Sequence, residues 1–137
     1  MSRDWRLYWD DVLVACRKVR RYVAGLDKEK FRSDERTYDA VLRNLEIIGE
    51  ASKHLPEQVR TRVAGVEWRK IAGFRDIVAH KYFGVDDAIL WDIVDVKVPE
   101  LLASLERVAP DALAQGSGSD QGTPMPPDPS GDSRGKA

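Results

Sequence analysis

Apolar residues recur every three or four positions through the first 109 residues of the chain, which is the period of an amphipathic α-helix. Gly25 follows the first such stripe and is suited to a helix C-terminus because glycine tolerates a left-handed backbone. The pattern therefore predicts a first helix over residues 4–24. Its apolar stripe consists of Trp5, Trp9, Val12, Cys16, Val19 and Val23.

The same period predicts three further long helices. The second has Ser33 as its N-cap, and Pro56 ends it or starts a short helical turn through about residue 63. The third spans residues 67–80, and the fourth is capped by Asp86 or Asp87. Pro99 should kink or split the fourth helix, because proline lacks a backbone donor and clashes one turn back. The three stripes are Tyr38, Val41, Leu42, Leu45, Ile48 and Leu55; Trp68, Ile71, Phe74 and Val78; and Leu90, Ile93 or Val94, Leu101, Leu105 and Val108.

The predicted fold class is all-α. No segment shows a convincing period-two alternation, which argues against a sheet. Four long helices joined by short connections favour an antiparallel four-helix bundle with a short extra helix. About 109 ordered residues bury one such core only marginally, and this size often goes with dimerisation.

The chain changes character after residue 109. Residues 110–137 contain five of the seven prolines and five of the ten glycines. This segment lacks apolar periodicity, and its prolines remove backbone donors. We predict a helical domain over residues 1–109 and a disordered Pro/Gly/Ser-rich tail over 110–137, which is either a dispensable extension or a partner-binding spacer.

Charge and cysteine usage exclude several classes of protein. The formal net charge is −1, with 22 Lys and Arg against 23 Asp and Glu. Such a balance argues against nucleic-acid binding by bulk positive charge alone. The single cysteine, Cys16, precludes an internal disulfide, and with only His54 and His80 a metal site is not expected. No apolar run is long enough for a membrane span, and no secretory signal is visible. We expect a cytoplasmic protein without a cofactor.

The candidate chemistry lies on the predicted third helix. At about 100° per residue, Arg75, Asp76, His80 and Tyr82 share one arc, and the apolar stripe lies opposite. Histidine is the side chain whose ordinary pKa lies nearest neutrality, so His80 is able to transfer a proton. Arg75 presents a planar set of donors that matches a phosphate. Asp76, one turn before His80, is placed to orient the imidazole. Together these groups form a minimal set for cleaving RNA through the 2′-hydroxyl.

Spacing alone leaves a structural interpretation open. In that interpretation Arg75 pairs with a neighbouring acid, and His80 is a residue near a helix C-terminus that the helix dipole favours. In the second helix, Arg43, Glu46 and Glu50 share one face, as in a salt-bridge row. Supporting roles are therefore assigned only provisionally to Asp76, Arg43, Asn44 and Glu50.

The segment Arg75-x4-His80-x-Tyr82 resembles the signature of the HEPN superfamily, in the longer form of the HepT group, also called the DUF86 family. The surroundings extend the resemblance over about residues 4–108. Residues 43–51 (RNLEIIGEA) resemble the family's second-helix motif. The run from Trp68 to Asp76 resembles the approach to its active-site helix, and residues 82–86 (YFGVD) resemble the exit from it.

This resemblance implies an all-α homodimer in which Arg75 and His80 of both protomers face a shared cleft. It implies a metal-independent endoribonuclease, the toxin of a type VII toxin–antitoxin pair. The antitoxin it implies is a minimal nucleotidyltransferase that silences the toxin by transferring AMP to Tyr82. Asp76 stands where family members often have Asn, and a carboxylate there repels a phosphate.

Two other functions stay open on the sequence. One is a non-catalytic nucleotide- or RNA-binding subunit that partners a nucleotidyltransferase. The other is an inert helical scaffold. Cleavage of RNA by the chain without a partner separates the enzyme from both. Charge changes at Arg75, His80 and Tyr82 separate the scaffold from the other two, since in a scaffold they affect stability only.

Overall fold

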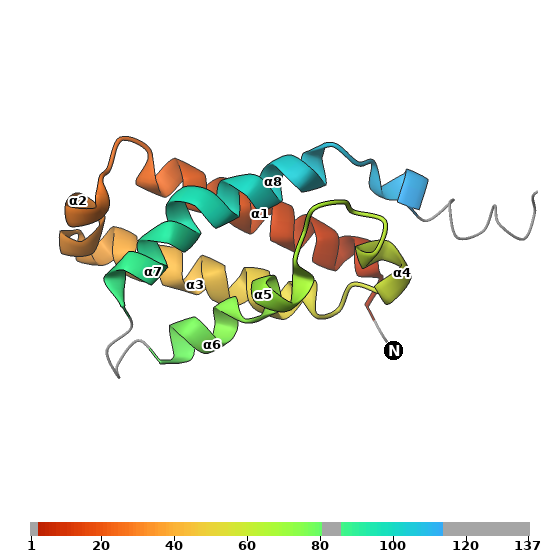
Figure 1. The fold of residues 1–137 in the computed structure, drawn as a ribbon, viewed down its shortest axis with the longest axis horizontal. Coiled ribbons are helices and arrows are strands. Elements are labelled where there is room, and N and C mark those ends of the chain that lie inside the picture. Colours follow the sequence, from red (N-terminus) through yellow and green to blue (C-terminus); the bar gives the residue numbers. More distant parts are fainter. Residues whose placement is uncertain (1–2, 81–85, 114–137) are drawn as a thin grey trace, which may run out of the picture.

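A computed structural model describes residues 3–80 and 86–113 of the chain, and within these residues it is helical with no strand (Figure 1). The all-α class is therefore confirmed. None of the described helices combines the length and apolar character that a membrane span requires. The elements in chain order are α1 (Trp5–Val23), α2 (Lys28–Ser33), α3 (Glu35–Ser52), α4 (Glu57–Arg60), α5 (Trp68–Ala72), α6 (Phe74–Ala79), α7 (Asp87–Asp92), the π-helical turn η2 (Ile93–Lys97) and α8 (Val98–Glu106).

The first predicted helix is confirmed as α1. Asp4 is its N-cap, and the carboxylate accepts a hydrogen bond from the Arg6 backbone N–H at 2.9 Å. Gly25 follows the helix with φ of +80°, the left-handed conformation that favours glycine. Every position of the stripe from Trp9 to Val19 is buried, so this face supplies the centre of the core.

The second predicted helix is present as α3, but its N-cap is Asp34 rather than Ser33. The Asp34 carboxylate accepts hydrogen bonds from the Thr37 backbone N–H at 3.1 Å and from the Thr37 hydroxyl at 2.9 Å. Ser33 is instead the last residue of α2, a short helix that Asp27 caps through the Lys30 N–H. An aspartate is thus the cap at both places.

The third predicted helix is interrupted. It consists of α5 and α6 with a turn at Gly73 between them, so the prediction of one continuous helix over 67–80 is wrong at this residue. Gly73 has φ of −69° and ψ of −10°, and its N–H bonds to the Arg69 carbonyl at 3.1 Å. Glycine lowers helix stability, which makes it the natural place for the break.

The predicted irregularity at Pro99 is confirmed. The chain passes from α7 through the π-helical turn η2 into α8, in which Pro99 lies in the first turn. The N–H of Val98 bonds to the Ile93 carbonyl, five residues back. The wider turn lets proline enter the helix where its missing donor matters least.

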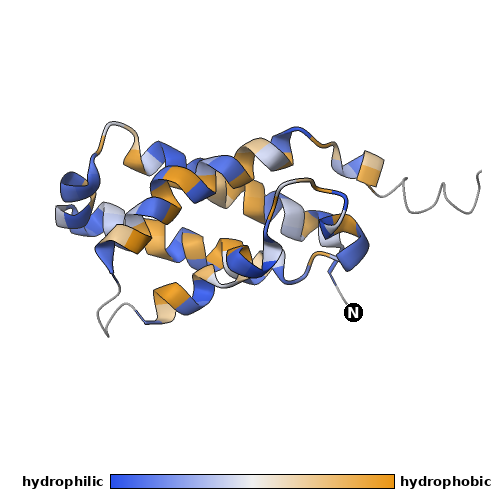
Figure 2. Cartoon of the chain, in the orientation of Figure 1, coloured by the Kyte–Doolittle hydropathy of each residue, from blue (hydrophilic) through white to orange (hydrophobic). Residues whose placement is uncertain are grey.

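The helices pack as a bundle around one core. α1 and α3 lie side by side at its centre, and α8 runs along α1 (Figure 1). Hydrophobic positions are concentrated where neighbouring helices face each other, and hydrophilic ones lie outside (Figure 2). Residues 110–113 form a final helical turn, and Leu113 is buried in the core. α6 lies at the edge of the bundle against α3, which leaves its outer side exposed.

Candidate active site

α6 presents the candidate residues to solvent. Arg75, Asp76 and His80 are exposed, whereas Phe74 on the opposite side is only 3% exposed. The arc expected from the helical period is thus present for these three residues. Tyr82 lies outside the described residues. The candidate base and the candidate cation are therefore both accessible to solvent.

Glu50 of α3 fixes the position of the Arg75 guanidinium. Arg75 Nη1 donates to Glu50 Oε1 at 2.7 Å, a charge-assisted hydrogen bond between residues 25 positions apart. The two side chains are 50% and 47% exposed, so the pair lies at the surface. Among the three provisional supporting residues of α3, Glu50 is the one that contacts Arg75.

A close approach of α3 and α6 makes this contact possible. A Cβ atom at Gly49 would lie 2.9 Å from the Arg75 backbone N and 3.1 Å from the Ala72 carbonyl oxygen. Neither backbone atom is able to move aside as a flexible side chain would. Gly49 therefore lets α3 approach α6 and brings the neighbouring Glu50 within reach of Arg75.

Glu50 also contacts two other cationic or titratable groups. Its Oε2 lies 3.3 Å from His54 Nε2, and its Oε1 lies 4.0 Å from Lys53 Nζ. The hydrogen bond from His54 has the largest effect and lowers the pKa of the Glu50 carboxyl. Desolvation opposes it as the next largest effect, and the charges of Arg75 and Lys53 lower the pKa further, so that the pKa is lowered overall. Glu50 is thus held as a carboxylate.

His54 takes part in this network, which the sequence reasoning missed. His54 is exposed near the C-terminal end of α3. Its ring also stacks on Tyr8 of α1, with centroids 4.4 Å apart and planes inclined by 14°. The four-residue spacing from Glu50 to His54 was the available signal, because residues so spaced are neighbours on a helix.

The His80 ring is oriented through the main chain. Its Nδ1 lies 2.7 Å from the backbone carbonyl oxygen of Asp76. A carbonyl only accepts, so Nδ1 carries the proton and the lone pair of the neutral ring is on Nε2. Asp76 was expected to orient the imidazole, and the contact that does so is its carbonyl oxygen.

The other two provisional supporting residues of α3, Asn44 and Arg43, do not contact Arg75. Asn44 is 6% exposed and donates to the Ala40 carbonyl at 2.8 Å, within its own helix. Arg43 is exposed, and in the part of the chain that the structure describes it makes no ion pair. Unlike Glu50, these two residues therefore do not help to position Arg75.

Two surface hollows border the candidate residues. One of about 240 Å³ is lined by Lys53, Arg69, Ala72, Gly73, Arg75 and Asp76. The other, of about 270 Å³, lies beside His80 and is lined by Asp76, Ile77, His80, Asp86 and Ile89. The site is thus a shallow, solvent-open surface.

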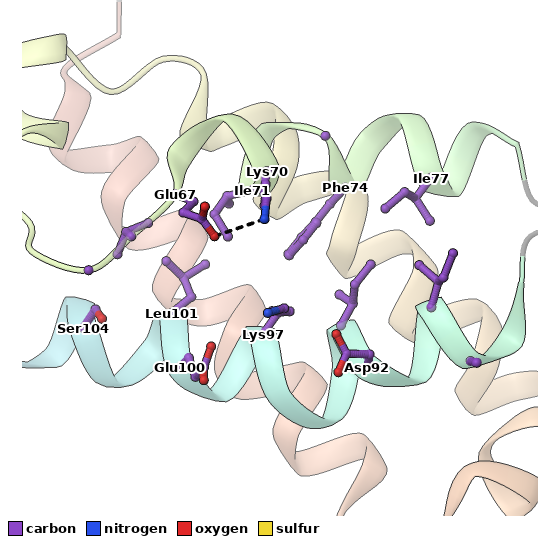
Figure 3. A pocket seen from close by; sticks show the side chains of 16 residues that line it. Glu67, Lys70, Ile71, Phe74, Ile77, Asp92, Lys97, Glu100, Leu101 and Ser104 are labelled. Carbon is purple, nitrogen blue, oxygen red and sulfur yellow. Dashed lines mark ion pairs between the residues drawn. The ribbon is translucent and has the colours of Figure 1, made fainter.

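A larger cavity, of about 620 Å³, lies elsewhere (Figure 3). It is an apolar groove between α5–α6 and the α7–η2–α8 segment, with Ile71, Phe74 and Leu101 in its lining. The ion pair between Glu67 and Lys70, 3.3 Å long, stands beside it. Neither Arg75 nor His80 lines this groove, so its size does not make it the candidate active site.

The other chemically distinctive residues do not form a second centre. Across residues 3–80 and 86–113, no group of three or more His, Cys, Asp and Glu is arranged to hold a metal ion. Cys16 is fully buried, and burial raises the pKa of its thiol to about 12. A thiol so protonated is a poor nucleophile, so Cys16 belongs to the core.

Comparisons with known proteins identify the same family that the motif around Arg75 and His80 resembles. The profile of the family described as Ribonuclease HepT-like matches residues 12–108. The chain is 36% identical to "Probable ribonuclease HepT" of Thermococcus cleftensis over 108 residues, which cover 79% of this chain and 98% of the relative. It is 36% identical to "Putative RNase MJ0127" of Methanocaldococcus jannaschii, covering 80% and 91%. It is 38% identical to "Putative RNase TTE0752" of Caldanaerobacter subterraneus, covering 75% and 92%. No solved structure matches the chain.

Proposed function

The chain belongs to the HepT-like ribonuclease family, and from this premise we propose that it is an endoribonuclease in which Arg75 and His80 cleave RNA without a metal ion. The observation that carries the proposal is that Arg75 of α6 and its C-cap residue His80 are both exposed and that Asp76 lines the hollow beside each of them. Five residues of helix separate them by about 7.5 Å along the axis. The Arg75 guanidinium is held by Glu50, and the His80 ring by the Asp76 carbonyl.

The chemistry follows from these groups. His80 Nε2 takes the proton of a ribose 2′-hydroxyl, and the 2′-oxygen forms a bond to the adjacent phosphorus. The bond from phosphorus to the 5′-oxygen breaks, and that oxygen takes a proton from water as it leaves. Arg75 donates to the non-bridging oxygens while negative charge grows on them. The products are a 2′,3′-cyclic phosphate and a 5′-hydroxyl, and no step changes an oxidation state.

The same proposal includes a homodimer and a partner. Support for the homodimer comes from the shallow site, which a second protomer would turn into a cleft. The partner is a minimal nucleotidyltransferase antitoxin that transfers AMP to Tyr82, as the family resemblance implies. Tyr82 follows His80 by two residues, and an added nucleotide there places a bulky anion beside the RNA-binding surface. Cytoplasmic action is part of this proposal.

Cleavage by the purified chain tests the enzymatic step. We expect RNA with 5′-hydroxyl and cyclic phosphate ends to accumulate in the presence of EDTA. His80→Ala and Arg75→Ala should each lower the cleavage rate at least about 100-fold, the usual contribution of such groups. Arg20→Ala removes an exposed arginine near the C-terminal end of α1 and serves as the matched control. Parental cleavage by the His80 variant would contradict the mechanism.

Expression with a nucleotidyltransferase encoded beside the gene tests the regulation. Mass spectrometry should find AMP on Tyr82, and the modified chain should not cleave RNA. Tyr82→Phe should be insensitive to the partner while still cleaving. If the unmodified chain binds RNA but never cleaves it, the protein is instead a non-catalytic binding subunit.

A further inference from the structure

We infer that the hollow beside Arg75 is a second phosphate-binding subsite, which holds the RNA phosphate next to the one being cleaved. The inference rests on the proposed function, because it takes RNA as the ligand. The hollow has a volume of about 240 Å³ and lies between the C-terminal end of α3 and the turn that joins α5 to α6. Its lining is Lys53, Arg69, Ala72, Gly73, Arg75 and Asp76.

Three elements contribute one cation each to this hollow. Lys53 is the C-cap residue of α3, Arg69 belongs to α5 and Arg75 to α6, and all three are exposed. Lys53 Nζ and Arg75 Nη1 both lie on Glu50 Oε1, at 4.0 Å and 2.7 Å, so their charges are close together. Three cations drawn from separate parts of the chain thus converge on one concavity.

The balance of charge around the hollow favours an anion. Within the lining, Lys53, Arg69 and Arg75 face a single carboxylate, Asp76. Including Glu50, three positive groups stand against two negative ones, whereas the whole chain carries −1. Arg69 makes no ion pair among residues 3–80 and 86–113, so no carboxylate of that part of the chain neutralises it. Its guanidinium is available to a phosphate oxygen.

Small residues form the rest of the lining. Ala72 and Gly73 also line the hollow, and neither has a long side chain that would fill it. A Cβ atom at Gly73 would already lie 3.3 Å from the Lys70 carbonyl oxygen. The concavity therefore exists because the chain has small residues between its basic ones.

Arg75 belongs both to this hollow and to the proposed cleavage site. A phosphate bound between Lys53 and Arg69 is therefore the neighbour of the phosphate that Arg75 and His80 act on. The apolar groove on the other side of α5 does not offer a comparable phosphate site, because no arginine lines it. The subsite would set the path of the RNA strand across α6 toward the end of α3.

Binding of an uncleavable RNA tests the subsite apart from catalysis. The probe is a fluorescent, fully 2′-O-methylated single-stranded RNA, titrated into the full chain at several KCl concentrations. Lys53→Ala and Arg69→Ala should each weaken binding about 3- to 10-fold and lower the slope of log Kd against log[KCl] by about 0.7, the loss of one phosphate contact to a single strand. Lys53→Arg and Arg69→Lys keep the charge and should keep the slope.

The controls separate this inference from the proposed function. Arg20→Ala, which removes the same charge from the end of α1 that joins α2, should change neither affinity nor slope (Figure 1). On cleavable RNA, Lys53→Ala and Arg69→Ala should raise KM and leave kcat near the parental value. Parental slopes in both variants overturn the subsite even if RNA is cleaved. Reduced slopes without any cleavage support the subsite and count against the enzyme.

Discussion

At the scale of single residues, Glu50 has a geometric rather than a stabilising role. It accepts from Arg75 at 2.7 Å and lies beside His54 and Lys53, yet these side chains are about half exposed. Exposed ion pairs contribute only about 0–1 kcal/mol to stability. Without the pair, however, the Arg75 side chain would regain several rotamers. Glu50 therefore matters mainly because it restricts where the guanidinium lies.

Substitution of Glu50 should separate these two effects. We expect Glu50→Ala to lower the free energy of unfolding by less than about 1 kcal/mol. The cleavage rate should fall about 10- to 100-fold, because catalysis is sensitive to displacements near 1 Å. Glu50→Gln retains an acceptor for Arg75 and should lose less activity. Denaturant unfolding and single-turnover cleavage are the measurements. Glu46→Ala, an exposed acid of the same helix, is the control. A Glu50→Ala variant as fast as the parent contradicts the positioning role.

How much of the site the sequence predicts depends on how far apart along the chain the contacting residues are. The helical period is sufficient to place Arg75, Asp76 and His80 on an exposed arc, because all three belong to one short helix. The partner of Arg75 was not predictable in this way, since Glu50 is 25 residues distant and meets it only when α3 packs on α6. The Nδ1 contact of His80 is likewise a matter of side-chain rotamer. The catalytic roles of these residues stay predictions.

At the scale of elements, periodicity predicts the existence of helices better than their ends. Most residues of the first, second and fourth predicted stripes are buried as expected, and Trp5, Val23, Tyr38 and Val108 are partly buried against the core. The short α2 was not separately predicted, because six residues are too few to show a period. The break at Gly73 and the cap at Asp34 depend on single residues within or beside a stripe. The close crossing at Gly49 has no periodic signal at all.

The crossing of α3 and α6 predicts the effect of Gly49→Ala. The new Cβ would lie 2.9 Å from the Arg75 backbone N, which forces the helices apart. We expect a loss of about 1–3 kcal/mol of stability, as in overpacked cores, together with reduced cleavage because Arg75 moves from Glu50.

Gly25→Ala provides the control for this variant. A Cβ there meets nothing within 4 Å, although φ of +80° strains it. It should lower stability without changing the cleavage rate of the folded protein. If Gly49→Ala and Gly25→Ala change stability and cleavage rate in the same way, Gly49 has no special relation to the site.

At the scale of the whole molecule, three carboxyl groups make the stability of the fold depend on pH. The backbone hydrogen bond from Arg6 lowers the pKa of Asp4, the one from Thr37 lowers that of Asp34, and the hydrogen bond from His54 lowers that of Glu50. These three groups act at the N-termini of α1 and α3 and at the α3–α6 contact. In the unfolded chain they bind protons at higher pH than in the native state.

Stability should therefore decline in acid. With lowered native pKa values, the contribution of these groups is complete above their ordinary pKa values, about 4, and is lost as pH falls through the lowered ones. Urea midpoints at pH 7, 5 and 3 should be similar at the first two and lower at the third. Asp34→Asn keeps a capping side chain that does not titrate, so its acid loss should be smaller. Equal losses in the variant and the parent would argue against the cap's contribution.

The extent of the domain is testable by truncation. Composition places the boundary after residue 109, whereas Leu113 is only 5% exposed and packs in the core. A chain ending at residue 113 keeps this contact, so we expect its melting temperature and cleavage rate to equal those of the full chain. A chain ending at residue 109 loses the burial of Leu113 and should be about 1.5–3 kcal/mol less stable. Leu113→Ala in the full chain should reproduce most of that loss and thereby assign it to the side chain. If the chain ending at residue 113 is itself destabilised, residues 114–137 contribute to the fold, and the predicted domain is too short.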